Sequence, residues 1–117
     1  MKILVVGYGS MGRRRIRLLQ RLVKNAAFIC VDKSVSRLQQ IREEGFLGYE
    51  NLEQGISEKP DLAFVCTSPG HHAEIILQLV NAGINVFTEL NLIDKDYDLI
   101  MARAEENKVV VFMSYSI

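Results

Sequence analysis

The sequence lacks any apolar run long enough to cross a membrane. A membrane-spanning helix needs roughly 20 consecutive apolar residues, and no run in this chain approaches that length. The apolar stretch inside the N-terminal segment MKILVVGYG is only about five residues, too short for the hydrophobic region of a secretory signal peptide. We therefore expect no membrane partner and a cytoplasmic location.

Cysteine is also scarce. The chain has only Cys30 and Cys66, each inside an apolar run, and they form no Cys-x-x-Cys pair. Two cysteines are too few for a cysteine-based zinc site or a disulfide framework, and we expect no metal site. The surrounding sequence predicts two buried, reduced thiols in strands.

Charge is balanced in number but not in position. The 117 residues contain 14 Lys and Arg and 14 Asp and Glu. Residues 1–42 hold ten of the basic residues against a single acid, Asp32, whereas residues 43–117 hold four against thirteen acids. The first part of the chain is therefore suited to meeting an anion, unless its basic helices lie beside acidic ones and the charges cancel.

Short apolar runs alternate with longer helical patterns along the whole chain. Runs of this kind, each separated by a helix, are typical of parallel strands that are covered on both faces. The sequence predicts an α/β fold, a doubly wound parallel sheet of the Rossmann type in one domain over residues 1–117. The expected strands are 2–6, 27–31, a short one near 46–50, 61–67, 84–89 and 109–115. The first expected helix follows Ser10 as its N-cap, and the second runs from Ser34 to Glu44. One helical turn is expected after Asn51, and two further helices over 71–83 and 94–108.

A glycine motif, G-x-G-x-x-G, joins the first strand to the first helix. Gly7 would permit the tight turn, Gly9 would let a pyrophosphate approach the backbone, and Gly12 would let helix and strand pack closely. The helix N-terminus would then hold the diphosphate. The residues between the glycines, Tyr8, Ser10 and Met11, are expected in the same site. The alternatives are a purely structural turn and, less well matched in glycine spacing, an S-adenosylmethionine site.

Asp32 strengthens the dinucleotide interpretation. It ends the second strand twenty residues after Gly12, where a carboxylate accepts hydrogen bonds from the adenosine ribose hydroxyls. The charge of Asp32 favours NAD over NADP, whose 2′-phosphate it would repel. Lys33, Ser34 and Arg37 follow at once, however, and can grip a 2′-phosphate if Asp32 turns aside. We expect NAD as the cofactor and leave NADP as the alternative.

The arginines after the glycine loop have two interpretations. Arg13, Arg17 and Arg21 recur every four residues and form one stripe of a solvated helix face. Cations are unfavourable in the first turn of a helix, so a phosphate contact by Arg13 or Arg14 would relieve that cost. Nucleic acid is not expected as a partner, because no known binding motif is present and no aromatic residues interleave with the basic run.

The stretch CTSPGHHAEIILQLVNAGINVFTELNL, residues 66–92, completes a recognisable pattern. With the glycine motif and the acid at the end of the second strand, it resembles the N-terminal cofactor domain of the glucose-fructose oxidoreductase / inositol dehydrogenase (Gfo/Idh/MocA) family of NAD(P)-dependent sugar oxidoreductases. The matching positions are Thr67, Ser68, Pro69 and His72 for a Thr-Pro-Asn-x-x-His-like stretch, then Ala82, Gly83, Val86 and Glu89.

The resemblance implies roles for these positions. Thr67, Ser68 and Pro69 would end the fourth strand beside the cofactor crevice. His72 would help to shape the nicotinamide side, although helix capping is an equal alternative for a histidine there. Glu89 would approach the nicotinamide ribose. The resemblance further implies hydride transfer to or from a sugar or polyol hydroxyl.

The sequence departs from the family where catalysis is concerned. The family follows its glutamate with Lys-Pro, and that lysine is a principal catalytic contact, whereas this chain has Leu90 and Asn91. Leucine can neither polarise nor protonate a reacting oxygen. The family's C-terminal substrate domain is also absent, so we assign no catalytic residue and expect cofactor binding without turnover. The alternatives are a non-catalytic NAD-binding sensor or partner subunit and an interaction domain with an empty cleft; homo-oligomer formation stays open.

Overall fold

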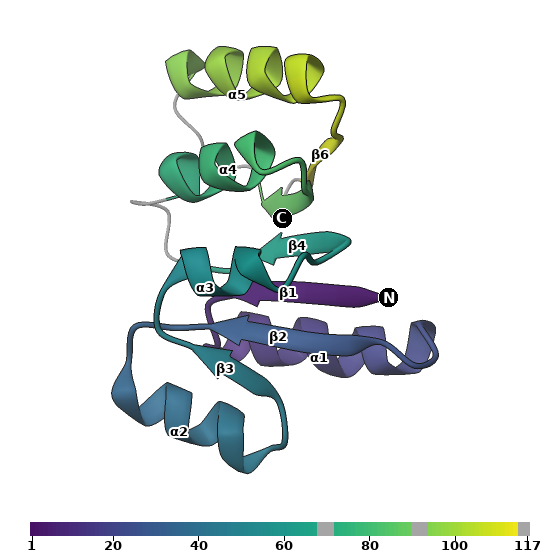
Figure 1. Ribbon diagram of the computed structural model, residues 1–117, viewed down its shortest axis with the longest axis vertical. Coiled ribbons are helices and arrows are strands. Elements are labelled where there is room, and N and C mark those ends of the chain that lie inside the picture. Colours follow the sequence, from purple (N-terminus) through teal and green to yellow (C-terminus); the bar gives the residue numbers. More distant parts are fainter. Residues whose placement is uncertain (68–71, 90–93, 115–117) are drawn as a thin grey trace.

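A computed structural model describes residues 1–67, 72–89 and 94–114 of the chain, apart from the side chains of Glu89, Asp94, Lys95 and Ser114. Strands and helices alternate throughout (Figure 1). The strands are β1 (Lys2–Val6), β2 (Ala27–Val31), β3 (Leu47–Tyr49), β4 (Leu62–Val65), β5 (Asn85–Glu89) and β6 (Val111–Ser114). The helices are α1 (Ser10–Leu22), α2 (Val35–Glu43), α3 (Leu52–Ser57), α4 (His72–Asn81) and α5 (Asp94–Asn107).

The six strands form one parallel sheet in the order β3-β2-β1-β4-β5-β6. This order confirms the predicted doubly wound topology. From β1 the chain adds β2 and β3 on one side. It then returns to the other side of β1, where β4, β5 and β6 follow in order. The strand order therefore reverses between β1 and β4, and in open α/β sheets ligands bind at the carboxyl ends of the strands at such a point.

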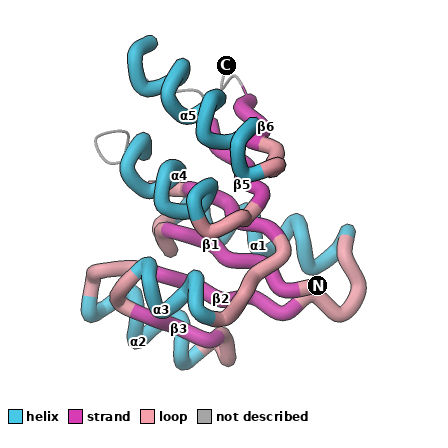
Figure 2. Tube along the Cα trace, turned by 45° about the horizontal axis from the view of Figure 1, so that its top comes forward, coloured by secondary structure: helices cyan, strands magenta, loops and turns pink. Residues whose placement is uncertain are grey.

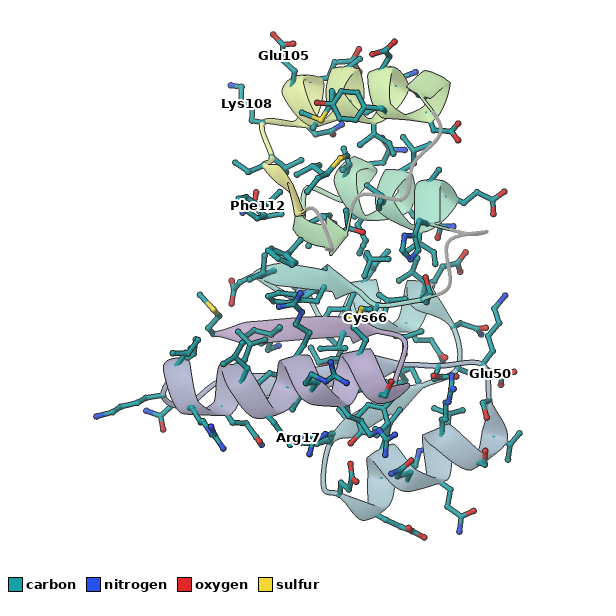
Figure 3. All side chains as sticks on the ribbon, turned by 180° about the vertical axis from the view of Figure 1, so that it is seen from behind. Arg17, Glu50, Cys66, Glu105, Lys108 and Phe112 are labelled. Atoms are coloured by element: carbon teal, nitrogen blue, oxygen red, sulfur yellow. The ribbon has the colours of Figure 1, made fainter. Side chains whose placement is uncertain are left out.

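The sheet is covered on both faces, but not to the same extent (Figure 2). On one face, α3, α4 and α5 pack on a core that runs from β2 across to β6 and includes the fully buried Leu4, Ile76 and Ile100. On the other face, α1 and α2 bury a second core that includes Ile16 and Ile41. In the view from behind, α1 lies across the face of the sheet near β1 (Figure 3).

A row of aromatic side chains marks the less covered part of that second face. Phe64, Phe87 and Phe112 are register partners on β4, β5 and β6. Their ring centroids are 5.0 and 5.1 Å apart. Exposure rises along the row, because Phe64 is 7% exposed and Phe112 is 55% exposed. The guanidinium carbon of Arg15 lies 5.1 Å from the centre of the Phe87 ring, so α1 extends at least to the middle of the row.

Two helix starts test the capping predictions. Ser34 caps α2 as expected, because its Oγ accepts the Arg37 N–H at 3.4 Å. The prediction that Ser10 caps the first helix is wrong. Gly9 is the cap, since its carbonyl accepts the first helical N–H, from Arg13, at 3.0 Å, and Ser10 is already helical.

The cysteine predictions have different outcomes. Cys30 is buried in β2, and burial raises the pKa of its thiol to about 12, as expected for an inert core cysteine. Cys66 is only half-buried and follows β4 rather than lying inside it, because the strand ends at Val65. The observed strand, Leu62–Val65, is therefore shorter than the strand expected over residues 61–67. Thr67 lies in the connection after it.

Candidate functional site

The glycine turn after β1 lies at the carboxyl edge of the sheet, at the point where the strand order reverses. Gly7 has a φ of +100°, a conformation that side-chain-bearing residues rarely adopt. Its N–H donates to the Val31 carbonyl at 2.8 Å, which ties the turn to the end of β2. A Cβ at Gly7 would lie 2.8 Å from the Cys66 carbonyl oxygen, so the turn also presses against the end of β4.

The other two glycines differ in what surrounds them. A Cβ at Gly12 would overlap the Gly7 carbonyl oxygen, so α1 can pack on the turn only with glycine at this position. At Gly9 the nearest atoms belong to the Arg37 side chain, 3.5 Å or more from a Cβ position. A flexible side chain can move away, and the backbone at Gly9 is therefore accessible to a ligand. Gly7 and Gly12 thus have the turn and packing roles expected from the motif, and the approach of a pyrophosphate at Gly9 stays a prediction.

The start of α1 is suited to an anion. No side chain caps the helix, and its first turn contains no acidic residue. The first N–H groups of a helix have no partner within it, and the helix dipole makes that end positive. Ser10 and Met11 are exposed there. Arg13 is half-buried and its Nε donates to the Gly9 carbonyl at 3.4 Å, so it supports the turn whether or not it also touches a phosphate.

Asp32 is the centre of a hydrogen-bond network beside the turn. One carboxylate oxygen, Oδ2, accepts the Tyr8 N–H at 2.8 Å, and the other, Oδ1, accepts the Ser34 N–H at 2.9 Å. The side chain is 8% exposed. The same carboxylate that was predicted to meet a ribose thus fixes the glycine turn against the start of α2, a role that the sequence did not reveal.

Tyr8 contributes its backbone rather than its ring. The side chain is 2% exposed and packs edge-on against Phe46, with ring centroids 6.4 Å apart. What it presents to the network is its N–H, bound to Asp32.

Arg37 lies directly beside Asp32. Its Nη1 is 3.6 Å from Asp32 Oδ2, and its side chain is 52% exposed. Lys33 is exposed as well. The Oγ atoms of Ser34 and Ser36 are 3.0 Å apart. Ser36 was not among the expected site residues, although the Ser-x-Ser sequence at the start of the helix indicates a second hydroxyl group near Ser34.

On the other side of the turn, the end of β4 carries buried polar atoms. The methyl group of Thr67 borders Gly7, 3.1 Å from a Cβ position there. His72 is 3% exposed and its Nε2 bonds the Thr67 carbonyl. Because a carbonyl only accepts, Nε2 is the donor in this bond. Thr67 Oγ1 and His72 Nδ1 are buried without a hydrogen-bond partner in the part of the chain that is described.

The remaining predicted positions are only partly visible. Ser68, Pro69 and Leu90 lie outside the described residues, and Glu89 is described only as the last residue of β5. The structure therefore brings together the glycine turn, Asp32, Arg37, Thr67 and His72, and it leaves the expected contacts of the other positions as predictions.

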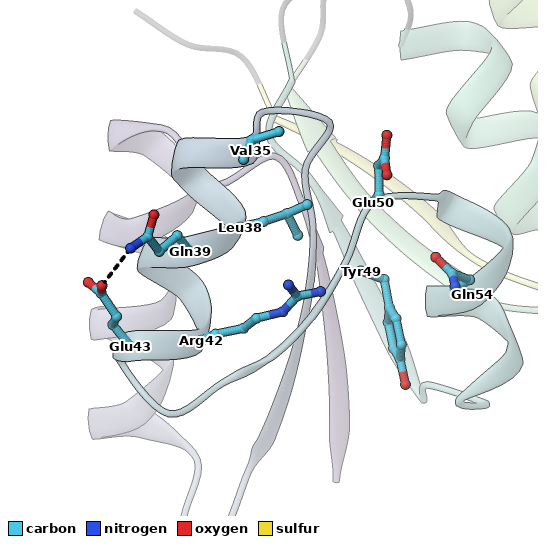
Figure 4. A pocket seen from close by; sticks show the side chains of 8 residues that line it. All are labelled: Val35, Leu38, Gln39, Arg42, Glu43, Tyr49, Glu50 and Gln54. Carbon is cyan, nitrogen blue, oxygen red and sulfur yellow. Dashed lines mark hydrogen bonds between the residues drawn. The ribbon is translucent and has the colours of Figure 1, made fainter.

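A separate open groove lies between α2 and α3, beside the edge strand β3 (Figure 4). Arg42 Nη2 donates to the Gly48 carbonyl at 3.3 Å, and the Tyr49 hydroxyl donates to Glu58 Oε2 at 2.6 Å, which raises the pKa of Tyr49. The other residues drawn there include Gln39, bonded to Glu43 at 3.2 Å. Since these groups are engaged with one another and none belongs to the predicted site, the groove carries no functional assignment.

Two further features bear on the class of site. In residues 1–67, 72–89 and 94–114, no three His, Cys, Asp or Glu side chains come together as metal ligands would. Over the same residues, no helix has both the length and the apolar character needed to cross a membrane.

Comparison with known proteins points in one direction. Residues 1–115 match the profile of a family described as an oxidoreductase family with an NAD-binding Rossmann fold. No curated protein sequence matches the chain.

Solved structures share the fold. A probable dehydrogenase from Thermotoga maritima is 25% identical, with a TM-score of 0.88 over 97% of this chain and 36% of its own. Myo-inositol 2-dehydrogenase from Lactobacillus plantarum is 21% identical, with a TM-score of 0.85 and the same coverage. The WlbA dehydrogenase from Chromobacterium violaceum, crystallised with NADH and UDP-GlcNAcA, is 20% identical, with a TM-score of 0.87 over 97% of this chain and 34% of its own. The chain thus spans about a third of the length of these proteins.

Proposed function

Because the chain belongs to the oxidoreductase family with the NAD-binding Rossmann fold, we propose that it binds NAD across the glycine turn and serves a hydride transfer between the nicotinamide and a sugar or polyol hydroxyl. The observation that carries the proposal is the joining of the glycine turn to Asp32 at the carboxyl edge of the sheet. The substrate class is supported by the myo-inositol and UDP-GlcNAcA named for two structures of the same fold.

Different residues would bind the diphosphate and the adenosine ribose of the dinucleotide. Gly9 leaves the backbone open to the diphosphate, and the N-terminal N–H groups of α1 face it without a competing cap. Asp32, already held by the Tyr8 and Ser34 N–H groups, has further lone pairs for the ribose hydroxyls. Fixed in this way, the carboxylate is preorganised and loses little freedom when the cofactor binds.

The end of β4 would meet the other part of the cofactor. When bound, the nicotinamide supplies the hydride chemistry, and the protein supplies binding and orientation. Thr67, whose methyl group borders Gly7, has in Oγ1 a buried donor and acceptor that suits a polar group of the cofactor. His72 holds the Thr67 carbonyl and so fixes the course of the chain beside the turn. Ser68, Pro69 and Glu89 keep their expected place on this side as part of the proposal.

Titration calorimetry with NAD tests the adenosine end. Asp32→Ala should raise the Kd for NAD about tenfold to a hundredfold, because hydrogen bonds to a charged group contribute roughly 1.5–3 kcal/mol. Asp61→Ala is a matched control: that carboxylate also accepts a backbone N–H at 2.8 Å, from Lys2 at the start of β1. Equal NAD affinity of the wild type and Asp32→Ala would disprove the ribose contact.

A second candidate function is a non-catalytic NAD-binding sensor or partner subunit. Leu90 favours it, because it stands where the family has a catalytic lysine. Under either function, the 117-residue chain should bind NAD and turn over no sugar or polyol. Robust dehydrogenase activity of this chain, measured as NADH absorbance, would contradict the expected lack of turnover under either function.

A further inference from the structure

A hollow of about 300 Å³ lies between α1 and the end of α2. One flank of α1 lines it with four side chains that share a helix face because of their spacing: Arg13, Ile16, Arg17 and Gln20. Arg17 lies on the side of α1 towards α2 (Figure 3). The lining is completed by Tyr8, Glu44 and Phe46. Two guanidinium groups therefore border one cavity, whose volume suits a small molecule.

Neither arginine has a counter-ion among the described residues. Arg13 and Arg17 form no ion pair with any of them. The acid in the lining, Glu44, instead accepts a hydrogen bond from Gln40 Nε2 at 3.5 Å. Like charges four residues apart on a helix repel each other and lower its stability. An anion bound between the two guanidinium groups would remove that cost.

The hydroxyl group of Tyr8 independently indicates a ligand. Tyr8 is 2% exposed and lines the hollow. Its contacts with the described residues involve its N–H, bonded to Asp32, and its ring, packed on Phe46, but not its hydroxyl group. A buried tyrosine hydroxyl usually finds a hydrogen-bond partner. This donor is therefore left for a group that enters the hollow.

The rest of the surface is apolar and continues beyond the hollow. Ile16 is 2% exposed, and the ring of Phe46 is half-buried. Gln20 and Phe46 also line an adjoining hollow of about 560 Å³. The large apolar side chains in that second hollow are Val23, Phe28 and Leu47. A ligand held at the arginines thus has apolar surface on which a hydrocarbon chain can lie.

We propose that the first hollow is a binding site for a small carboxylate that carries an apolar chain. A planar carboxylate matches the fork of N–H donors on a guanidinium group. Arg13 has Nη1 and Nη2 left for it, because the bond to the Gly9 carbonyl uses Nε. Arg17 and the Tyr8 hydroxyl group donate to the same carboxylate, and the chain lies along Phe46 into the second hollow.

The charge of the lining favours a carboxylate over a phosphate. Arg13 and Arg17 carry two positive charges, and Glu44 carries one negative charge. A single carboxylate neutralises the remaining positive charge. A phosphate monoester, with a charge near −2 at neutral pH, would leave an excess of negative charge beside Glu44.

The experiment is an NMR titration of the ¹⁵N-labelled chain with hexanoate. Hexanamide has the same chain without the charge, and acetate has the charge without the chain. Hexanoate should bind about tenfold or more tightly than either, because it alone offers both a charge-assisted contact and an apolar chain. The amide signals of Gln20, Glu44 and Phe46 should shift.

Substitutions on the lining separate this site from a general effect of charge. Arg17→Gln should raise the Kd for hexanoate about tenfold or more, and Tyr8→Phe about threefold or more, since each removes one donor. Arg21→Gln is the matched control: Arg21 lies one turn farther along the same stripe of α1, outside the described lining. It should leave the Kd within about twofold. Thermal unfolding without ligand checks that each variant is folded.

Four outcomes would overturn the proposal. Hexanoate that binds no more tightly than hexanamide would exclude a carboxylate site. Equal losses in Arg17→Gln and Arg21→Gln would show only a general attraction of anions to α1. Unchanged affinity in Tyr8→Phe would remove the assigned donor. Displacement of hexanoate by NAD would make the hollow part of the proposed dinucleotide site, whereas the proposal expects both ligands to bind together.

Discussion

The two halves of the sheet end in different ways at the edge where the cofactor is proposed to bind. On the β1–β3 side, Asp32 accepts hydrogen bonds from the Tyr8 and Ser34 N–H groups and forms an ion pair with Arg37. On the β4 side, Thr67 Oγ1 and His72 Nδ1 are buried without a hydrogen-bond partner in the described residues. Leaving a buried polar group unpaired costs roughly 1–3 kcal/mol. The β1–β3 side is therefore already organised, whereas the β4 side carries two polar atoms that no described residue pairs and that are available to a ligand.

The two halves of the sheet also differ in how completely helices cover their faces. Around β1, both faces are covered by helices and the core residues are fully buried. Towards β6, the face shared with α1 ends in Phe112, which is more than half exposed. Stability should therefore be concentrated around β1 and the glycine turn, and substitutions should become better tolerated towards β6.

Gly12→Ala should have the largest effect. The new methyl group would overlap the Gly7 carbonyl, which belongs to the backbone and cannot give way cheaply. We expect a loss of roughly 3 kcal/mol or more in the free energy of unfolding, with NAD binding lost too. Gly45→Ala is the control, because Gly45 has a φ of +87° but no neighbour within 4 Å of a Cβ position. It should cost about 1 kcal/mol. Equal losses in urea unfolding would contradict the close packing of α1 on the turn.

The aromatic row gives the next largest difference. Phe64→Ala removes a ring that is 7% exposed from between β1 and β5 and should cost about 3 kcal/mol. Phe112→Ala removes the 55% exposed ring of β6 and should cost about 1 kcal/mol or less, mainly the stacking on Phe87. Urea unfolding of both variants measures the gradient across the sheet. A Phe112→Ala loss as large as that of Phe64→Ala would mean that the β6 side is as well packed as the centre.

The sequence predicted the fold because its signals are local. Short runs such as ILVV and FICV, rich in β-branched residues, favour buried strands covered on both faces. A helix separates each such run from the next, which leaves few topologies. The glycine motif and Asp32 were predictable for the same reason, since their spacing is fixed by one βαβ unit.

What the sequence did not reveal depends on tertiary placement. That Asp32 holds the Tyr8 and Ser34 N–H groups follows from the way β1 and β2 end side by side. The ring of Tyr8 is buried against Phe46, which is distant in sequence, whereas the expected contact of Tyr8 with the cofactor stays a prediction. Ser10 is a good cap by type, but the turn set by Gly7 starts the helix one residue early.

Thr67→Val should have a small effect on stability, and the sign of that effect is informative. The substitution keeps the shape of the side chain and removes a buried hydroxyl that pairs with none of the described residues, so unfolding should become about 1 kcal/mol less favourable. Thr88→Val is the control, because Thr88 has an interaction partner and, at 1% exposed, is more buried than the half-buried Thr67; it should lower stability by about 1 kcal/mol. If the Thr67 hydroxyl pairs with the cofactor, Thr67→Val should also raise the Kd for NAD several-fold while the free protein becomes more stable. Loss of stability in Thr67→Val would show that the hydroxyl is already satisfied in the free protein, and the contrast between the two halves of the sheet would then fail.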